Sequence, residues 1–155
     1  KNLEMKHTLI ALLLIISASA FGQSRFSKGE FSINGFRAPS IGLEYRYKIV
    51  SLHAGYYLTS FGEGVTTNFI KTGLTAWFMP VGKRENPSSF YAGASLMRGL
   101  NEDYKDESAF GFEAGFRWMI WEGLNLRIGA IAVTGEGHDV EINPAGGISY
   151  SFFFE

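Results

Sequence analysis

Hydrophobic and polar positions alternate along most of the chain with a period of two. One track is rich in Leu, Ile, Phe and Tyr, and the other is rich in Gly, Ser and charged residues. Such alternation is typical of β-strands whose two faces meet different surroundings. It predicts eight strands, at residues 31–36, 41–48, 52–59, 69–78, 90–97, 110–120, 124–133 and 147–154. The expected fold is all-β: an eight-stranded antiparallel up-and-down β-barrel.

The polar track carries glycine in every predicted strand from the second to the eighth. These glycines are Gly42, Gly55, Gly73, Gly93, Gly111, Gly115, Gly129 and Gly147. Glycine is depleted from strand faces that meet water, because it loses more conformational entropy on folding than other residues. A narrow eight-stranded interior, in contrast, has room for little more than small residues beside a few large ones. The pattern therefore favours a barrel with its apolar track outside, as in a transmembrane barrel.

Charged residues lie on the same track as the glycines. The candidates for an interior polar network are Glu44, Arg46, His53, Lys71, Glu113, Arg117 and Arg127. Buried charges are costly unless they are paired, so we expect these side chains to pair across the lumen and to plug it. The alternative is a soluble, lipocalin-like periplasmic barrel, in which the charges face water and the apolar track binds an apolar ligand.

Aromatic residues gather at the predicted strand ends. Tyr47, Phe78, Phe90, Trp118 and Phe154 fall on one side, and Phe36, Phe61, Phe69 and Phe110 are candidates for a ring at the other. Aromatic rings of this kind favour the interface of a bilayer. The connections 48–50 and 121–123 are short, while 61–67, 98–108 and 134–144 are longer and are expected to face outward. Two connections depart from this asymmetry, the long 80–89 and the short 37–40.

The N-terminal segment has the features of a signal peptide. Met5, the expected initiator, is followed by Lys6 and by an apolar block at 9–16, which is too short to span a bilayer as a helix. Small residues then offer cleavage before Phe21 or, as we favour, before Gln23. The alternative is a buried core helix. We expect residues 1–22 to be the signal peptide and 23–155 to be a single barrel domain.

Composition narrows the function classes. The 155 residues include 14 Lys and Arg against 15 Asp and Glu, a net charge of −1, and there is no Cys. No basic surface is available to collect phosphates, so nucleic acid is not an expected partner. The absence of Cys excludes disulfides, thiolate metal sites and cysteine nucleophiles.

The C-terminal strand carries the most specific resemblance. Gly147, Ile148, Tyr150, Phe152 and Phe154 form a glycine followed by alternating hydrophobic residues that end in an aromatic. The chain resembles the small outer-membrane β-barrel proteins, the group that includes the transmembrane domain of OmpA and OmpX. The final Glu155, and Ala145 in place of a polar residue, depart from that pattern. The resemblance implies a cell outer-membrane location, recognition by the barrel-assembly machinery, and contact with outer-membrane lipid and lipopolysaccharide.

Catalytic chemistry finds little support in the sequence. His53 and His138 are the histidines after the leader, and neither has the Ser two residues on that lipid A deacylase barrels carry. The acidic loop residues Glu102, Asp106 and Glu107 lack the spacing of an EF-hand, so we expect a solvated loop and no metal or cofactor. We therefore expect a non-enzymatic, monomeric outer-membrane barrel whose outer loops contact the envelope or the surroundings. A lipid A-modifying enzyme is the alternative within the same group.

Overall fold

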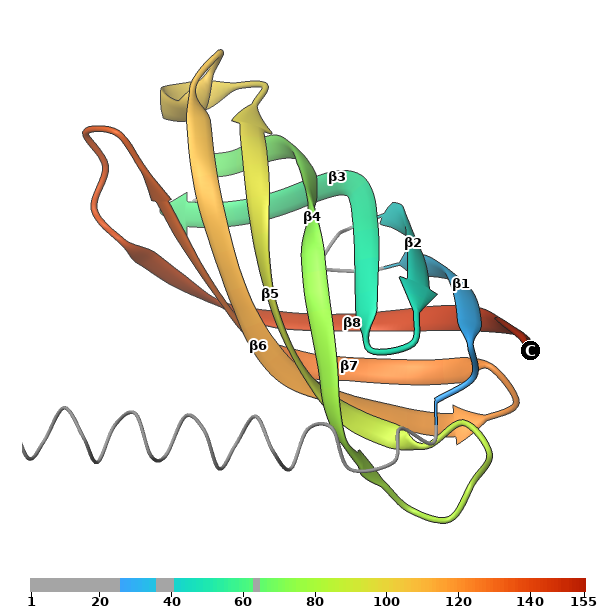
Figure 1. The fold of residues 1–155 in the computed structure, drawn as a ribbon. Coiled ribbons are helices and arrows are strands. Elements are labelled where there is room, and N and C mark those ends of the chain that lie inside the picture. The colour runs from blue at the N-terminus through green and yellow to red at the C-terminus, as the bar shows by residue number, and fades with distance from the viewer. Residues whose placement is uncertain (1–25, 36–40, 63–64) are drawn as a thin grey trace, which may run out of the picture.

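Eight antiparallel strands close into a barrel in the computed structural model, which describes residues 26–35, 41–62 and 65–155. The strands are β1 (Gly29–Gly35), β2 (Ile41–Tyr47), β3 (Val50–Gly62), β4 (Val65–Val81), β5 (Ser88–Gly99), β6 (Ser108–Trp121), β7 (Leu124–Gly135) and β8 (Glu141–Phe154), with a 3-10 turn, η1 (Glu102–Tyr104), between β5 and β6 (Figure 1). Each strand pairs with its sequence neighbour, and β1 pairs with β8 to close the ring. The prediction of an eight-stranded antiparallel barrel is confirmed.

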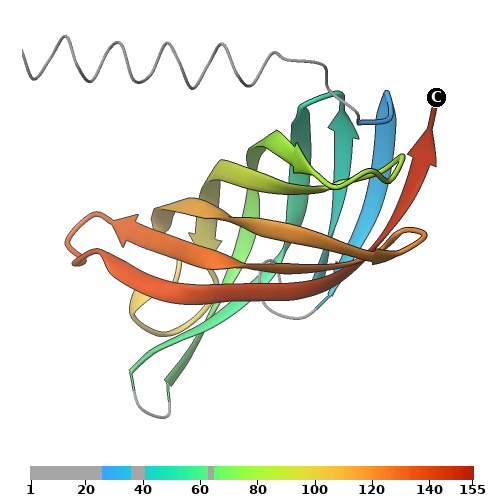
Figure 2. The ribbon, with the colours of Figure 1, turned by 90° about the horizontal axis from the view of Figure 1, so that it is seen from below.

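The strands differ in length, so one side of the barrel is shorter than the other. β1 and β2 have 7 residues each, whereas β4 has 17 and β6 and β8 have 14 each. At about 3.3 Å per residue, seven residues extend only about 23 Å along the strand. The longer strands continue past β1 and β2 toward η1 (Figures 1 and 2).

The two faces of each strand separate by polarity in the direction opposite to that of a soluble barrel. Leu74, Phe112 and Ile128 are 56%, 55% and 66% exposed on the outer surface. Glu113 and Arg127, which lie on the other track, are buried in the interior. The outer surface at these positions therefore carries large apolar residues, while charged residues lie inside.

Interior glycines allow neighbouring strands to approach closely. A Cβ atom on Gly73 would lie 2.2 Å from the carbonyl oxygen of Ala94, and a Cβ on Gly129 would lie 2.2 Å from that of Ala114. The obstacle is the backbone of the adjacent strand, which cannot move aside as a flexible side chain can. The glycine track thus reflects tight inward curvature as well as limited space in the lumen.

Three expectations about loops and aromatics are wrong. The connection expected over 134–144 is shorter, because β7 continues to Gly135 and β8 begins at Glu141. The connection expected over 61–67 is also shorter, because β3 continues to Gly62 and β4 begins at Val65, with a register shift between the Thr59–Thr67 and Gly62–Val65 pairs. Phe69 does not join an outer aromatic ring, since its side chain is fully buried inside the barrel. Its position on the same track as Lys71 accounts for this inward direction.

Several sequence-based expectations lie outside the described residues. They concern the signal peptide at 1–22, Phe36, the connection 37–40 and the side chain of Phe61. Among the described residues, no helix is long and apolar enough to cross a membrane.

Candidate functional site in the barrel interior

Seven charged side chains lie in the interior of the barrel, and we call them the ionic layer. Its members are Glu30, Glu44, Arg46, Lys71, Glu113, Arg117 and Arg127, all of them buried. They come from β1, β2, β4, β6 and β7, so the layer crosses the lumen. Pairing of this kind is what makes buried charges tolerable.

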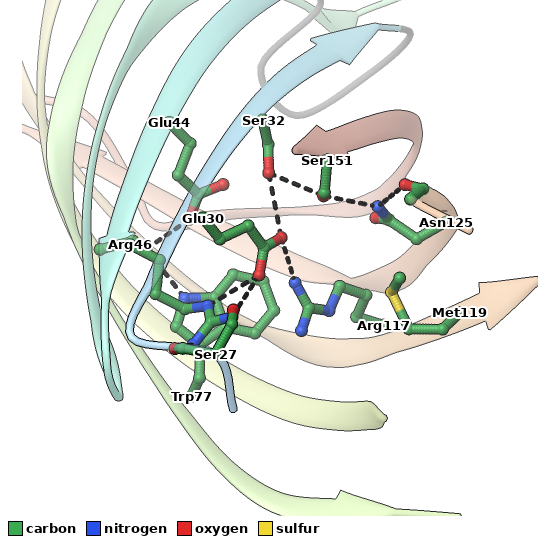
Figure 3. A network of polar contacts seen from close by, with 12 residues as sticks. Ser27, Glu30, Ser32, Glu44, Arg46, Trp77, Arg117, Met119, Asn125 and Ser151 are labelled. Atoms are coloured by element: carbon green, nitrogen blue, oxygen red, sulfur yellow. Dashed lines mark hydrogen bonds and ion pairs between the residues drawn. The ribbon is translucent and has the colours of Figure 1, made fainter. Parts of the chain in front are cut away.

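Glu30 is shared by two arginines from different strands. Its Oε2 accepts hydrogen bonds from Arg46 Nε at 2.8 Å and Nη2 at 2.5 Å, and its Oε1 accepts one from Arg117 Nη1 at 2.7 Å (Figure 3). Ser32 Oγ donates to the same Oε1 at 3.1 Å. One carboxylate therefore connects β1 with β2 on one side and with β6 on the other.

Glu44 occupies a second pairing centre. Its Oε2 contacts Arg127 Nη1 at 2.7 Å and accepts a hydrogen bond from Asn34 Nδ2 at 3.2 Å. Ser51 Oγ donates to its Oε1. The carboxylate of β2 is thus tied to β1, β3 and β7.

Lys71 and Glu113 form a third pair, with Nζ and Oε2 2.6 Å apart. The ammonium group also lies 5.8 Å from the ring centroid of Tyr57. This pair borders the apolar end of the lumen.

Trp77 lies beside two of these arginines. Its ring centroid is 4.4 Å from Arg117 Cζ and 5.0 Å from Arg127 Cζ, within the range of cation–π attraction. Its indole Nε1 donates to Ser51 Oγ at 2.8 Å, and its ring packs against Tyr91 with centroids 5.3 Å apart. Trp77 therefore belongs both to a small apolar group with Phe26 and Tyr91 and to the surroundings of the ionic layer.

His53 lies between two hydroxyl groups. Its Nε2 is 3.0 Å from Ser95 Oγ, and its Nδ1 is 3.2 Å from Thr75 Oγ1. A Ser–His pair is the first requirement of a hydrolytic nucleophile, but such a base also needs an orienting acid and access to substrate. Here the third group is a hydroxyl, and all three side chains are buried. The arrangement is that of an interior hydrogen-bond network.

A second region of the interior, the apolar cluster, fills the opposite end. Its members are Tyr57, Phe69, Met97, Tyr104, Ala109, Ile131, Val133 and Ala145. Tyr104 of η1 folds over it, with its ring centroid 5.2 Å from that of Phe69 and 4.0 Å from that of His138. His138 Nε2 is also 2.8 Å from Glu107 Oε2, which joins the β5–β6 and β7–β8 connections.

All seven residues of the sequence-based interior network have buried side chains, and each contacts another interior group. Glu30 is not in the predicted network because the predicted first strand begins at 31. Extending the alternation backward would have found it, since Glu30, Ser32 and Asn34 share the inward face of β1. Trp77 is also not in the predicted network, because an aromatic on the polar track gives no sign of which cation it will contact.

The C-terminal strand forms the seam of the barrel. Its pairing with β1 runs from Gly29 opposite Phe154 to Gly35 opposite Ile148. Ile148, Tyr150, Phe152 and Phe154 are exposed on the outer surface. Recognition of this strand by the assembly machinery stays a prediction.

Other parts of the described residues offer less chemistry. No group of three or more His, Asp or Glu side chains in residues 26–35, 41–62 and 65–155 is arranged to hold a metal ion. A cleft of about 730 Å³ lies at the end of the barrel near the β4–β5 and β6–β7 turns, lined by residues that include Arg84, Trp121 and Tyr150. Arg84 Nη1 already donates to the carbonyl oxygens of Met119 and Ile120, at 2.7 Å each.

Comparison of the chain with protein-family models, with curated proteins and with solved structures finds no match. The fold and the geometry of the interior therefore carry the functional argument.

Proposed function

We propose that this protein is a non-enzymatic integral outer-membrane β-barrel protein, with an interior plugged by the ionic layer and outer loops that contact the envelope or the surroundings. The observation that carries the proposal is the inverted polarity of the barrel. Large apolar side chains are exposed on its outer surface, while seven charged side chains are buried within it. In water this arrangement would cost free energy on both faces, whereas a bilayer solvates the outer face.

The hydrogen bonding of the backbone also supports a position in a bilayer. A bilayer core has no water to satisfy N–H and C=O groups, so strands can cross it only as a closed barrel. Here β1 and β8 pair over seven consecutive residues, so the ring is closed over the length of β1. Exposed aromatics at one end, including Tyr47, Trp118 and Phe154, suit the bilayer interface.

The plugged interior supports a structural role over that of a pore. Glu30, Glu44 and Glu113 each pair with a cation from another strand, so the side chains span the lumen. An eight-stranded barrel is narrow enough for such side chains to fill it. We expect reconstituted protein in a planar bilayer to show no porin-like conductance, and steady porin-like steps would contradict the plug.

The non-enzymatic part of the proposal rests on His53 and Ser95. They form the Ser–His pair that the lipid-modifying alternative needs, but both side chains are buried. We expect His53→Ala to leave the lipid A pattern of the producing cells unchanged. A changed pattern from a variant that still assembles would favour the enzyme.

Location is tested by fractionation. We expect the full chain in the outer-membrane pellet, resistant to alkaline extraction, with a folded band that shifts on heating. The informative variant is Leu74→Arg, which places a charge on the outer face. A cation at the bilayer midplane costs about 2–4 kcal/mol, so assembly should fall. Glu136→Arg, in the exposed β7–β8 connection, is the matched control and should assemble normally. Release of the wild-type chain with the periplasmic fraction would contradict the proposal.

A further inference from the structure

The ionic layer contains one more cation than carboxylate. Among the described residues, the buried carboxylates are Glu30, Glu44 and Glu113, and the buried cations are Arg46, Lys71, Arg117 and Arg127. His53 is not counted among these fixed charges: its two ring nitrogens are paired with hydroxyl groups, which can serve a neutral ring as donor and as acceptor. An uncompensated charge in a low-dielectric interior is unfavourable, so the lumen favours one added negative charge.

Two of the four cations, Arg117 and Arg127, have hydrogen-bond partners for only some of their N–H groups. Arg117 and Arg127 each use Nη1 to contact a carboxylate, Glu30 and Glu44 respectively. Within the described residues, Nε and Nη2 of both side chains are buried and have no hydrogen-bond partner. Arg46, in contrast, uses Nε, Nη1 and Nη2 in hydrogen bonds.

The two arginines lie next to each other. They are direct cross-strand partners in the β6–β7 ladder, and both guanidinium groups lie within 5.0 Å of the ring centroid of Trp77. A guanidinium over an aromatic face still presents N–H groups along its edge. Ser89 is the β5 partner of Arg117, and its buried side chain lies next to that arginine on the inner face of the barrel.

Hydrogen-bond capacity favours an acceptor over water. An Nε carries one N–H and an Nη2 carries two, so the two arginines present about six unpaired N–H groups. Among the described residues, Asn34 Oδ1 and Asn125 Oδ1 are buried amide oxygens without a hydrogen-bond partner, and they are fewer than the unpaired N–H groups. Water brings donors as well as acceptors and cannot supply the missing charge. A small anion brings acceptor capacity and negative charge together.

We propose that the interior beside Arg117 and Arg127 binds one small inorganic anion of chloride size. The ligand neutralises the surplus charge and accepts hydrogen bonds from the unpaired Nε and Nη2 groups. This binding site is structural: it completes the plug. The inference depends on the interior alone and holds whether or not the proposed location is correct.

The direct test uses bromide, which replaces chloride and scatters X-rays anomalously. The full-length protein is refolded in a non-ionic detergent with sodium bromide and crystallised. We expect an anomalous peak inside the barrel within hydrogen-bond distance of Arg117 or Arg127. Well-ordered side chains with no interior peak, or peaks confined to the outer surface, would overturn the proposal.

A second test moves the charge into the protein. Ser89→Asp places a carboxylate beside Arg117, while Ser89→Asn has a similar shape and no charge. At constant ionic strength, replacing sodium gluconate with sodium bromide should raise the melting temperature of the wild type and of Ser89→Asn by several degrees. Ser89→Asp should lose most of that shift. Equal shifts in Ser89→Asp and Ser89→Asn, or no shift in the wild type, would contradict an interior anion.

Discussion

The ionic layer and the apolar cluster fill different parts of one lumen with different chemistry. The boundary between them lies near the point where the short strands β1 and β2 end. Glu30 comes from β1, and Glu44 and Arg46 come from β2. Among the described residues, the apolar cluster draws its members from β3 to β8 and η1, and none from the two short strands. Charges therefore concentrate where all eight strands surround the lumen.

The difference shows how each end is stabilised. Where the ring is complete, backbone encloses the side chains on every side, and buried charges are stabilised by pairing across the lumen. Beyond β1 and β2 the wall is incomplete, so the longer strands must bury their inner faces by packing against one another and under η1. That end resembles the core of a soluble protein, and Tyr104 covers it. Substitutions at the two ends should therefore fail for different reasons.

The largest expected effect is at the packed end. Phe69→Ala removes a fully buried ring that packs on Tyr57 and Tyr104, and it leaves a cavity. We expect the free energy of unfolding to fall by about 4 kcal/mol in urea titrations of detergent-folded protein. Phe112→Ala, on the outer face, is the control. It loses the transfer term without a cavity, so its cost should be about 2 kcal/mol. Equal costs would mean that the cluster is not tightly packed.

Glu30→Gln tests the paired end. The amide keeps the shape of the side chain but leaves Arg46 and Arg117 without their shared carboxylate. Breaking a buried pair in this way should cost about 3 kcal/mol of unfolding free energy, measured by the same titration. Glu136→Gln, in the exposed β7–β8 connection, should change it by less than about 0.5 kcal/mol. A negligible effect of Glu30→Gln would show that the arginines find other partners.

The sequence predicted the barrel because period two, glycine and charge agree along the chain. Gly111, Glu113 and Arg117 lie on one track of β6, and Phe110, Phe112 and Trp118 lie on the other. Which face of each strand points into the lumen can be predicted without knowing distant contacts, because the alternation of side chains is a local property of a strand.

The partners of each charge could not be predicted. Arg117 contacts Glu30, which lies 87 positions away in the sequence, and this contact depends on the register of three ladders, β6–β7, β7–β8 and the closing β8–β1. Phe69 was misplaced although its position on the same track as Lys71 directs it inward. The sequence does not show that it packs there against Tyr57 and Tyr104. Pairing and packing are global properties of this fold.

The boundary between the two ends can be moved. Lys71 and Glu113 are paired, and Lys71 Nζ lies 5.8 Å from the ring of Tyr57 in the apolar cluster. Lys71→Met alone leaves Glu113 buried without its cation. The double variant Lys71→Met with Glu113→Leu should recover about 2 kcal/mol of the unfolding free energy that the single variant loses, because the whole pair becomes apolar. A double variant less stable than the single variant would mean that the pair is required for folding at this position.

The smallest expected effect is at the cover of the apolar cluster. His138 contacts Glu107 and stacks on Tyr104, so it holds the β7–β8 connection against the β5–β6 connection. His138→Ala should lower the free energy of unfolding by only about 1 kcal/mol, since the contact with Glu107 is partly exposed and one aromatic contact is lost. Its clearer effect should be local: faster cleavage by protease within 100–107 and 136–140, followed by mass spectrometry. Asp139→Ala, an exposed neighbour, should leave the cleavage rate unchanged. If both variants are cleaved at the wild-type rate while Phe69→Ala is cleaved faster, Tyr104 is held by the packed cluster beneath it and the contact with His138 is incidental.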